Sequence, residues 1–125
     1  MARLIVAGID PSLTNTGMAV LDNGQPIAVH KTGHPGRSGA SDIERMQRVG
    51  SLVASVTKFI AIHTPDLIVI ESPAYGQYLP STCDRNVLWG ILVHRYSVAH
   101  TRTNRGYAGI TPTCRAQFAT GNGHG

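Results

Sequence analysis

The chain has 125 residues and a mass of 13.3 kDa, which suits one folded domain and is too short for two. Hydrophobic residues make up 42% and charged residues 14%, a balance that excludes a disordered chain. The net charge of +4 comes mainly from arginine, which favours phosphate or nucleic-acid partners.

Membrane and secretory classes are also disfavoured. The apolar runs are too short to cross a bilayer, and the run at residues 4–7 ends in a turn and does not form a signal peptide. Cys83 and Cys114 lack metal-ligand spacing and indicate reduced thiols. We therefore expect a cytoplasmic protein with no membrane partner.

Three strands are expected first. Residues 3–10 form an apolar run that ends in Asp10, typical of a central strand. Strands at 17–22 and 26–32 follow, and the tight-turn sequence Asp22-Asn23-Gly24 joins them as an antiparallel hairpin. Residues 33–40 have the composition of a loop.

A long helix is expected to begin after Ser41, because Ser41 and Glu44 have the spacing of a capping box. It should end near His63, before Pro65. The apolar stripe predicted for this helix consists of Ile43, Met46, Val49, Val53, Val56 and Ile60.

A fourth strand is predicted at 66–71, parallel to the first because a helix separates them. The next helix, at 84–100, has almost no polar face, which indicates burial on more than one side. In so small a domain the second side suits a partner subunit. We therefore expect a homodimer whose interface includes Trp89, Leu88, Leu92, Val93 and Tyr96. A short strand at 107–111 and a helical turn at 112–118 complete the elements.

Two carboxylates, Asp10 and Glu71, each stand where an apolar strand stops. Parallel strands end at the same edge of a sheet, where α/β proteins bind ligands. Two acids there would repel each other unless a divalent cation lay between them, and oxygen ligands suit Mg²⁺ or Mn²⁺. The alternative is that one or both are ordinary strand-end acids that face water.

The order of elements, with acids on the first and fourth strands, resembles the ribonuclease H-like nucleases. Three segments resemble the RuvC-type Holliday-junction resolvases, in the compact form of phage or prophage versions: Gly8 to Gly17, Pro65 to Glu71, and Pro112 to Gly123. The resemblance implies an α/β fold with a five-stranded mixed sheet. Three strands would be antiparallel and two parallel, with helices on both faces.

The resemblance also implies metal-dependent cleavage of four-way DNA junctions by a homodimer, in which each subunit nicks one strand. Two metal ions per site would be held with Asp10 between them and Glu71 on one of them. The family's further ligands come from a helix after the last Gly-rich turn, which is where this chain ends. We therefore expect residues 1–125 to form a single, C-terminally truncated nuclease domain that binds DNA and one metal ion with little cleavage.

The remaining DNA contacts are expected from aromatic and basic side chains. By resemblance, Tyr75 or Tyr78 would stack on an unpaired base, and Arg115 would substitute for a phosphate-binding lysine. Arg85, Arg102 and Arg105 could add phosphate contacts.

Three other readings stay open. The first is a non-catalytic module that binds branched DNA by its structure, and the second is a related nuclease that processes ribosomal RNA. The third is a fragment of an actin-like sugar kinase or ATPase. Those proteins have a glycine where this chain has Ser12, and they need two lobes.

Overall fold

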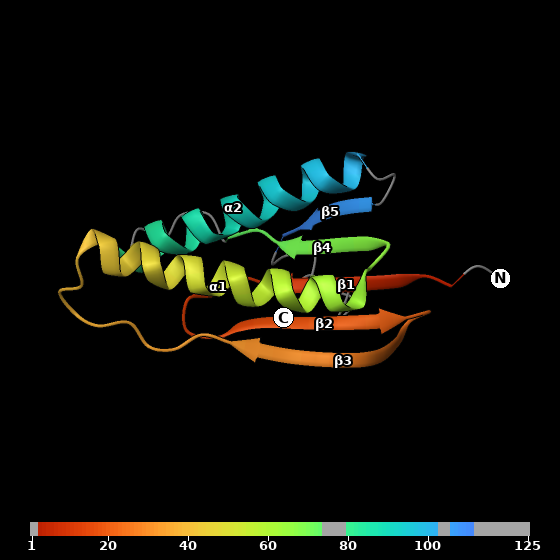
Figure 1. Cartoon of the computed structure of the whole chain (residues 1–125), viewed down its shortest axis with the longest axis horizontal. Helices are drawn as coiled ribbons and strands as arrows, with labels where there is room; N and C mark the ends of the chain where they lie inside the picture. Colours follow the sequence, from red (N-terminus) through yellow and green to blue (C-terminus); the bar gives the residue numbers. More distant parts are fainter. Residues whose placement is uncertain (1–2, 74–79, 103–105, 112–125) are drawn as a thin grey trace.

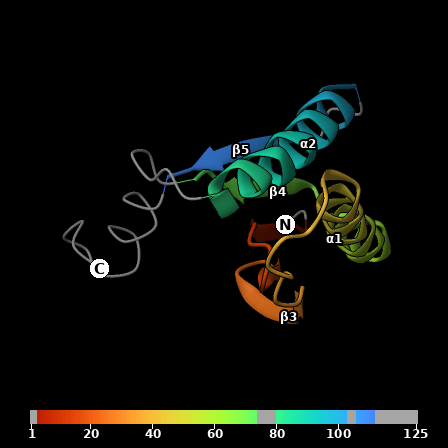
Figure 2. The same ribbon diagram turned by 90° about the vertical axis from the view of Figure 1, so that its left-hand side faces the viewer.

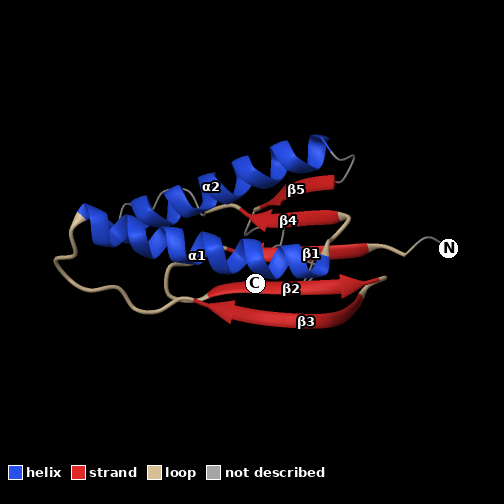
Figure 3. Cartoon of the chain, viewed as in Figure 1, coloured by secondary structure: helices blue, strands red, loops and turns tan. Residues whose placement is uncertain are grey.

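The computed structural model describes residues 3–73, 80–102 and 106–111 (Figure 1). Five strands and two helices follow one another in this order: β1 (Ile5–Asp10), β2 (Thr16–Asp22), β3 (Gln25–Thr32), α1 (Asp42–His63), β4 (Leu67–Glu71), α2 (Pro80–Arg102) and β5 (Gly106–Ile110). The strands form one sheet in the order β3-β2-β1-β4-β5 (Figure 3). β2 is antiparallel to β1 and β3, whereas β4 is parallel to β1 and β5. The predicted mixed sheet is therefore confirmed.

Both described helices cover the same face of this sheet, as the end-on view in Figure 2 shows. We call it the helix face. On β1, β2 and β4, every second side chain lies on this face. The buried side chains there, each at most 3% exposed, are Ala7, Ile9, Met18, Val20, Ile68 and Ile70. They form one core cluster with residues of α1 and α2. The helix expected on the opposite face is not among the described residues, and the turn predicted at 112–118 lies outside them.

α1 begins and ends where the sequence predicts. The side chain of Ser41 accepts a hydrogen bond from the backbone N–H of Glu44 at 3.2 Å, and the Glu44 carboxylate accepts one from the Ser41 backbone at 3.4 Å. This is the expected capping box. At the other end, Thr64 adopts a left-handed conformation with φ of 42° and ends the helix.

The apolar stripe of α1 differs from the prediction at its first turns. The buried residues are Val49, Leu52, Val56 and Ile60. Ile43 is 72% exposed and Met46 is 43% exposed. Figure 1 gives the reason, since the first turns of α1 project past the ends of the strands, where no sheet covers them.

The β2–β3 turn and Asp66 fix the start of β1. Asn23 and Gly24 have φ values of 47° and 83°, which match the predicted two-residue hairpin turn. Asn23 also exchanges two hydrogen bonds with Leu4, at 2.8 and 2.7 Å. On the other side, the Asp66 carboxylate accepts a hydrogen bond from the Ile5 backbone at 2.9 Å. β1 is thus held in register between its neighbours.

Neither α1 nor the described part of α2 is apolar enough over a sufficient length to span a bilayer.

Candidate active site

Asp10 and Glu71 lie next to each other on adjacent parallel strands. β1 and β4 pair Ile9 with Ile70, so the next residue of each strand is an acid at the same edge of the sheet. Side chains alternate between the two faces of a strand. Since Ile9 and Ile70 point into the helix face, Asp10 and Glu71 belong to the opposite face, which we call the acid face. Both line one cavity there, of about 330 Å³.

Hydrogen bonds fix the turn that follows Asp10. The buried side chain of Thr16 accepts a hydrogen bond from the Ser12 backbone at 3.0 Å and donates one to the Ser12 carbonyl. From α2, Arg85 donates to the Pro11 carbonyl at 3.0 Å. The backbone that carries Asp10 is therefore held by its own turn and by a second element. This contact also places Arg85, one of the predicted phosphate-binding residues, beside the turn next to Asp10.

The backbone around Glu71 is held in a similar way. Glu71 itself is 6% exposed and pairs with Ile110 of β5. The next residue, Ser72, donates its backbone N–H to the Ile110 carbonyl at 2.8 Å. The side-chain hydroxyl of Ser72 donates to the same oxygen at 3.3 Å. Both acids thus stand on ordered backbone at the end of a central strand.

The donor chemistry of this pair fits a hard divalent cation. Carboxylate oxygens are the ligands that Mg²⁺ and Mn²⁺ prefer, and Mg²⁺ commonly keeps several waters beside one or two carboxylates. Within the described residues, no group of three or more His, Cys, Asp or Glu side chains lies close enough to hold a metal ion. The described part of the site therefore offers two carboxylates and no third ligand from those four residue types.

The other acids have structural roles away from this site. Asp66 lies at the opposite end of β4, as the sequence predicts. Asp22 forms an ion pair with Arg3 at 2.6 Å. Asp42 and Glu44 lie in the first turn of α1.

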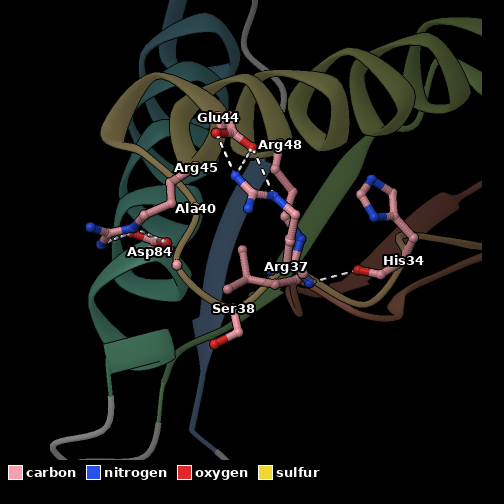
Figure 4. A pocket seen from close by; sticks show the side chains of 11 residues that line it. His34, Arg37, Ser38, Ala40, Glu44, Arg45, Arg48 and Asp84 are labelled. Atoms are coloured by element: carbon pink, nitrogen blue, oxygen red, sulfur yellow. Dashed lines mark hydrogen bonds and ion pairs between the residues drawn. The ribbon is translucent and has the colours of Figure 1, made fainter.

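The fifth acid, Asp84, belongs to a second cavity of about 570 Å³ between the 33–40 loop and the starts of both helices (Figure 4). Arg45 of α1 donates two hydrogen bonds to Asp84 of α2, at 2.6 and 2.9 Å. These bonds hold the pKa of the Asp84 carboxyl below its ordinary value. Arg37 similarly pairs with Glu44 at 2.7 Å, and Arg48 donates to the His34 carbonyl at 2.6 Å. The three arginines of this cavity thus connect the loop and the two helices through hydrogen bonds and ion pairs.

The residues predicted for a dimer interface divide into two groups. Leu88 and Leu92 are 0% exposed and Tyr96 is 6% exposed, because all three pack in the core beneath α2. They are not on a surface that a partner could contact, which corrects the prediction for these three. Trp89 and Val93 are only partly buried. The apolar residues of α2 therefore serve mainly to pack this helix against the chain's own sheet and against α1.

The surface of α2 nevertheless has an apolar groove. Ile91 is 42% exposed and Val98 is 40% exposed, and both line it. Val53 of α1 lines the other side of the groove. The sequence did not predict this groove, because the hydrophobic pattern of α2 does not distinguish its buried apolar residues from its exposed ones.

Five of the predicted DNA contacts lie outside the described part of the structure. Tyr75, Tyr78, Arg105 and Arg115 lie outside the described residues, and so does the side chain of Arg102. All five stay predictions.

The sheet order, its mixed direction and the two acids at the central strand ends define a ribonuclease H-like fold of the RuvC type. Comparison with solved structures supports this. Thermus thermophilus RuvC in complex with a Holliday-junction substrate matches with a TM-score of 0.68 and 19% identity, over 98% of this chain and 72% of RuvC. A second structure of T. thermophilus RuvC gives 0.63 and 20% identity over the same shares.

The yeast mitochondrial Holliday-junction resolvase Ydc2 matches with a TM-score of 0.60 and 13% identity, over 90% of this chain and 52% of Ydc2. No family model matches the sequence, and no curated protein matches it. At these identities the likeness establishes the fold.

Proposed function

We propose that this chain is the nuclease domain of a Holliday-junction resolvase, which hydrolyses phosphodiester bonds of branched DNA with the help of divalent metal ions. One observation carries the proposal, namely that Asp10 and Glu71 are neighbours on the acid face of a RuvC-type sheet. T. thermophilus RuvC, whose fold this chain shares, is known in complex with a Holliday-junction substrate, which supports the proposal.

In this proposal Asp10 and Glu71 hold the cation through their carboxylate oxygens. When bound, Mg²⁺ or Mn²⁺ would activate a water and stabilise the leaving oxygen of the phosphodiester. The Ser12–Thr16 hydrogen bonds and the contact of Arg85 with Pro11 keep Asp10 in place for this task. The resemblance to the resolvases implies two ions per site, for which Asp10 and Glu71 would be ligands.

The DNA is expected to contact basic and aromatic side chains around the acids. Arg85, Arg102, Arg105 and Arg115 are the proposed phosphate contacts, and Tyr75 or Tyr78 is the proposed stacking residue. Arg85 is the best supported of them, because its hydrogen bond to Pro11 holds its guanidinium beside the Asp10 turn.

We also propose that the chain acts as a homodimer, since two related active sites are needed to nick two strands of one junction. Closed two-fold dimers use the same surface patch on both subunits. Trp89 and Val93 are the predicted interface residues that remain partly exposed on α2. The buried indole N–H of Trp89 has no hydrogen-bond acceptor among the described residues.

A second function is a structure-selective module without catalysis. Among the described residues, Asp10 and Glu71 have no third His, Cys, Asp or Glu beside them that could hold a metal, and this set suits a module that binds a junction and cuts it slowly or not at all. Such a protein would recognise branched DNA by its structure and use the cation to neutralise phosphate charge.

The two functions are separated by incubating the chain with four-way junction and duplex DNA in Mg²⁺ and in Mn²⁺. Cleavage of the junction that disappears in Asp10→Asn supports the nuclease. Salt-dependent binding to the junction over the duplex, without cutting in either metal, supports the binding module. Equal binding to junction and duplex, with no cutting, would overturn both.

A further inference from the structure

Lys31 lies in the same cross-strand row as the two acids. Asp10 of β1 pairs with Gly17 of β2, and Gly17 pairs with Lys31 of β3. Glu71 extends the row on the other side of Asp10. Residues that lie opposite each other on neighbouring strands share a face of the sheet. All four residues line the cavity of the acid face.

A β-bulge puts Lys31 in this row. The hairpin turn pairs Asp22 with Gln25, and an unbroken ladder from there would place His30 opposite Gly17. Instead the register shifts between Val20 and Leu21, so that Lys31 takes that place and His30 pairs with Met18 on the helix face. Bulges occur often beside active sites, where they redirect a side chain from one face to the other.

Among the described residues, no side chain is found in the space above Gly17, between Lys31 and Asp10. Two strand spacings separate the two residues, which amounts to about 10 Å between their backbones. Gly17 stands between them, and a Cβ built on it would meet no atom of the described residues within 4 Å. The long, flexible stem of lysine can therefore cross above Gly17 toward the acids. Glycine weakens a strand, and it often marks a place where a ligand comes close.

The charges in this row suit an anion that binds together with a cation. Lys31 is exposed, and no carboxylate among the described residues forms an ion pair with it. The two acids outweigh the single lysine while no cation is held. With a divalent cation on the acids, the row becomes positive overall and attracts a phosphate.

We propose that Lys31 is a phosphate-binding residue of the candidate active site, whose ammonium group holds a DNA phosphate next to the cation on Asp10 and Glu71. This inference rests on the proposed function. The competing explanation is that Lys31 only keeps the edge strand β3 from pairing with other chains, a common use of lysine.

The chain offers a matched control, because it has only two lysines. Lys58 is exposed on α1 and lies on the helix side of the sheet, so Lys58→Ala removes the same charge away from the acid face. Both variants would be compared with the wild type for binding to four-way junction DNA in Mg²⁺, over a series of salt concentrations. Circular dichroism would verify that each variant is folded.

We expect Lys31→Ala to weaken binding about three- to tenfold and to reduce the salt slope by about one, as the loss of one phosphate contact does. Lys31→Arg should bind nearly as the wild type does, and Lys58→Ala should not differ from it. In a second readout, junction DNA should protect Lys31 from acetylation and leave Lys58 reactive.

Two failures would be distinguishable. If the wild type binds the junction, but Lys31→Ala binds equally with the same salt slope and Lys31 stays reactive, the role of Lys31 is overturned and the proposed function stands. If the wild type shows no preference for the junction and does not cut it, the proposed function fails and the phosphate role of Lys31 fails with it.

Discussion

Truncation to alanine should destabilise the protein strongly at one apolar residue of α1 and hardly at all at another. Leu52 is 3% exposed, whereas Ile43 is 72% exposed on the turns that project past the sheet. Truncation to alanine removes three carbon atoms from either side chain. For Leu52 these atoms are buried, and their transfer to water costs about 2.4 kcal/mol at about 0.8 kcal/mol per CH₂ group.

The cavity left at Leu52 adds to this cost, so we expect Leu52→Ala to lower the free energy of unfolding by about 3 kcal/mol. For a domain of this size, the corresponding fall in Tm is about 12 °C. Ile43→Ala should change the free energy of unfolding by less than about 0.5 kcal/mol, because its side chain is already in water.

Urea unfolding followed by far-ultraviolet circular dichroism measures both changes, and thermal scans give Tm. The reasoning would be refuted by equal losses in the two variants, or by a larger loss for Ile43→Ala. Either result would mean that α1 turns a different face to the sheet, namely the apolar stripe predicted from the sequence, which includes Ile43 and omits Leu52.

The remaining predictions concern α2. Because Arg45 holds the pKa of Asp84 below its ordinary value, this ion pair stabilises the fold above about pH 4, and its contribution is lost as the pH falls through the lowered pKa. The urea midpoints of the wild type and Asp84→Asn should therefore differ at neutral pH and converge in acid; a difference that does not depend on pH would contradict this. At the α2 surface, Trp89→Glu should convert a dimeric wild type into a folded monomer, as measured by light scattering. An unchanged dimer mass, or a wild type that is already monomeric, would end the interface proposal.

Features that depend on local sequence were predictable. The Asn23-Gly24 turn requires positive φ at both residues, and the Ser41–Glu44 capping box is a short-range pattern. The apolar runs before Asp10 and Glu71 likewise identify strands, and the intervening helix sets their parallel direction. From these elements alone the two acids could be expected at one edge of the sheet.

Features that depend on distant contacts were not predictable in this way. The partners Arg45 and Asp84 are far apart in sequence, so no local pattern indicates that they pair. Similarly, periodicity alone could not show that Leu88 and Leu92 face the chain's own core. The bulge that directs Lys31 to the acid face has no clear signature in the strand, since it depends on how β2 and β3 pair.

The central claim is that Asp10 and Glu71 share a cation, and Mn²⁺ titration by calorimetry tests it without DNA or cleavage. The variants are Asp10→Asn, Glu71→Gln and the double variant. Asp42→Asn serves as a control, because this carboxylate is 95% exposed on α1. We predict that each single variant binds Mn²⁺ at least about tenfold more weakly, that the double variant loses little more, and that the control binds as the wild type does. Unchanged affinity in either single variant, or losses that simply add in the double variant, would contradict a shared cation.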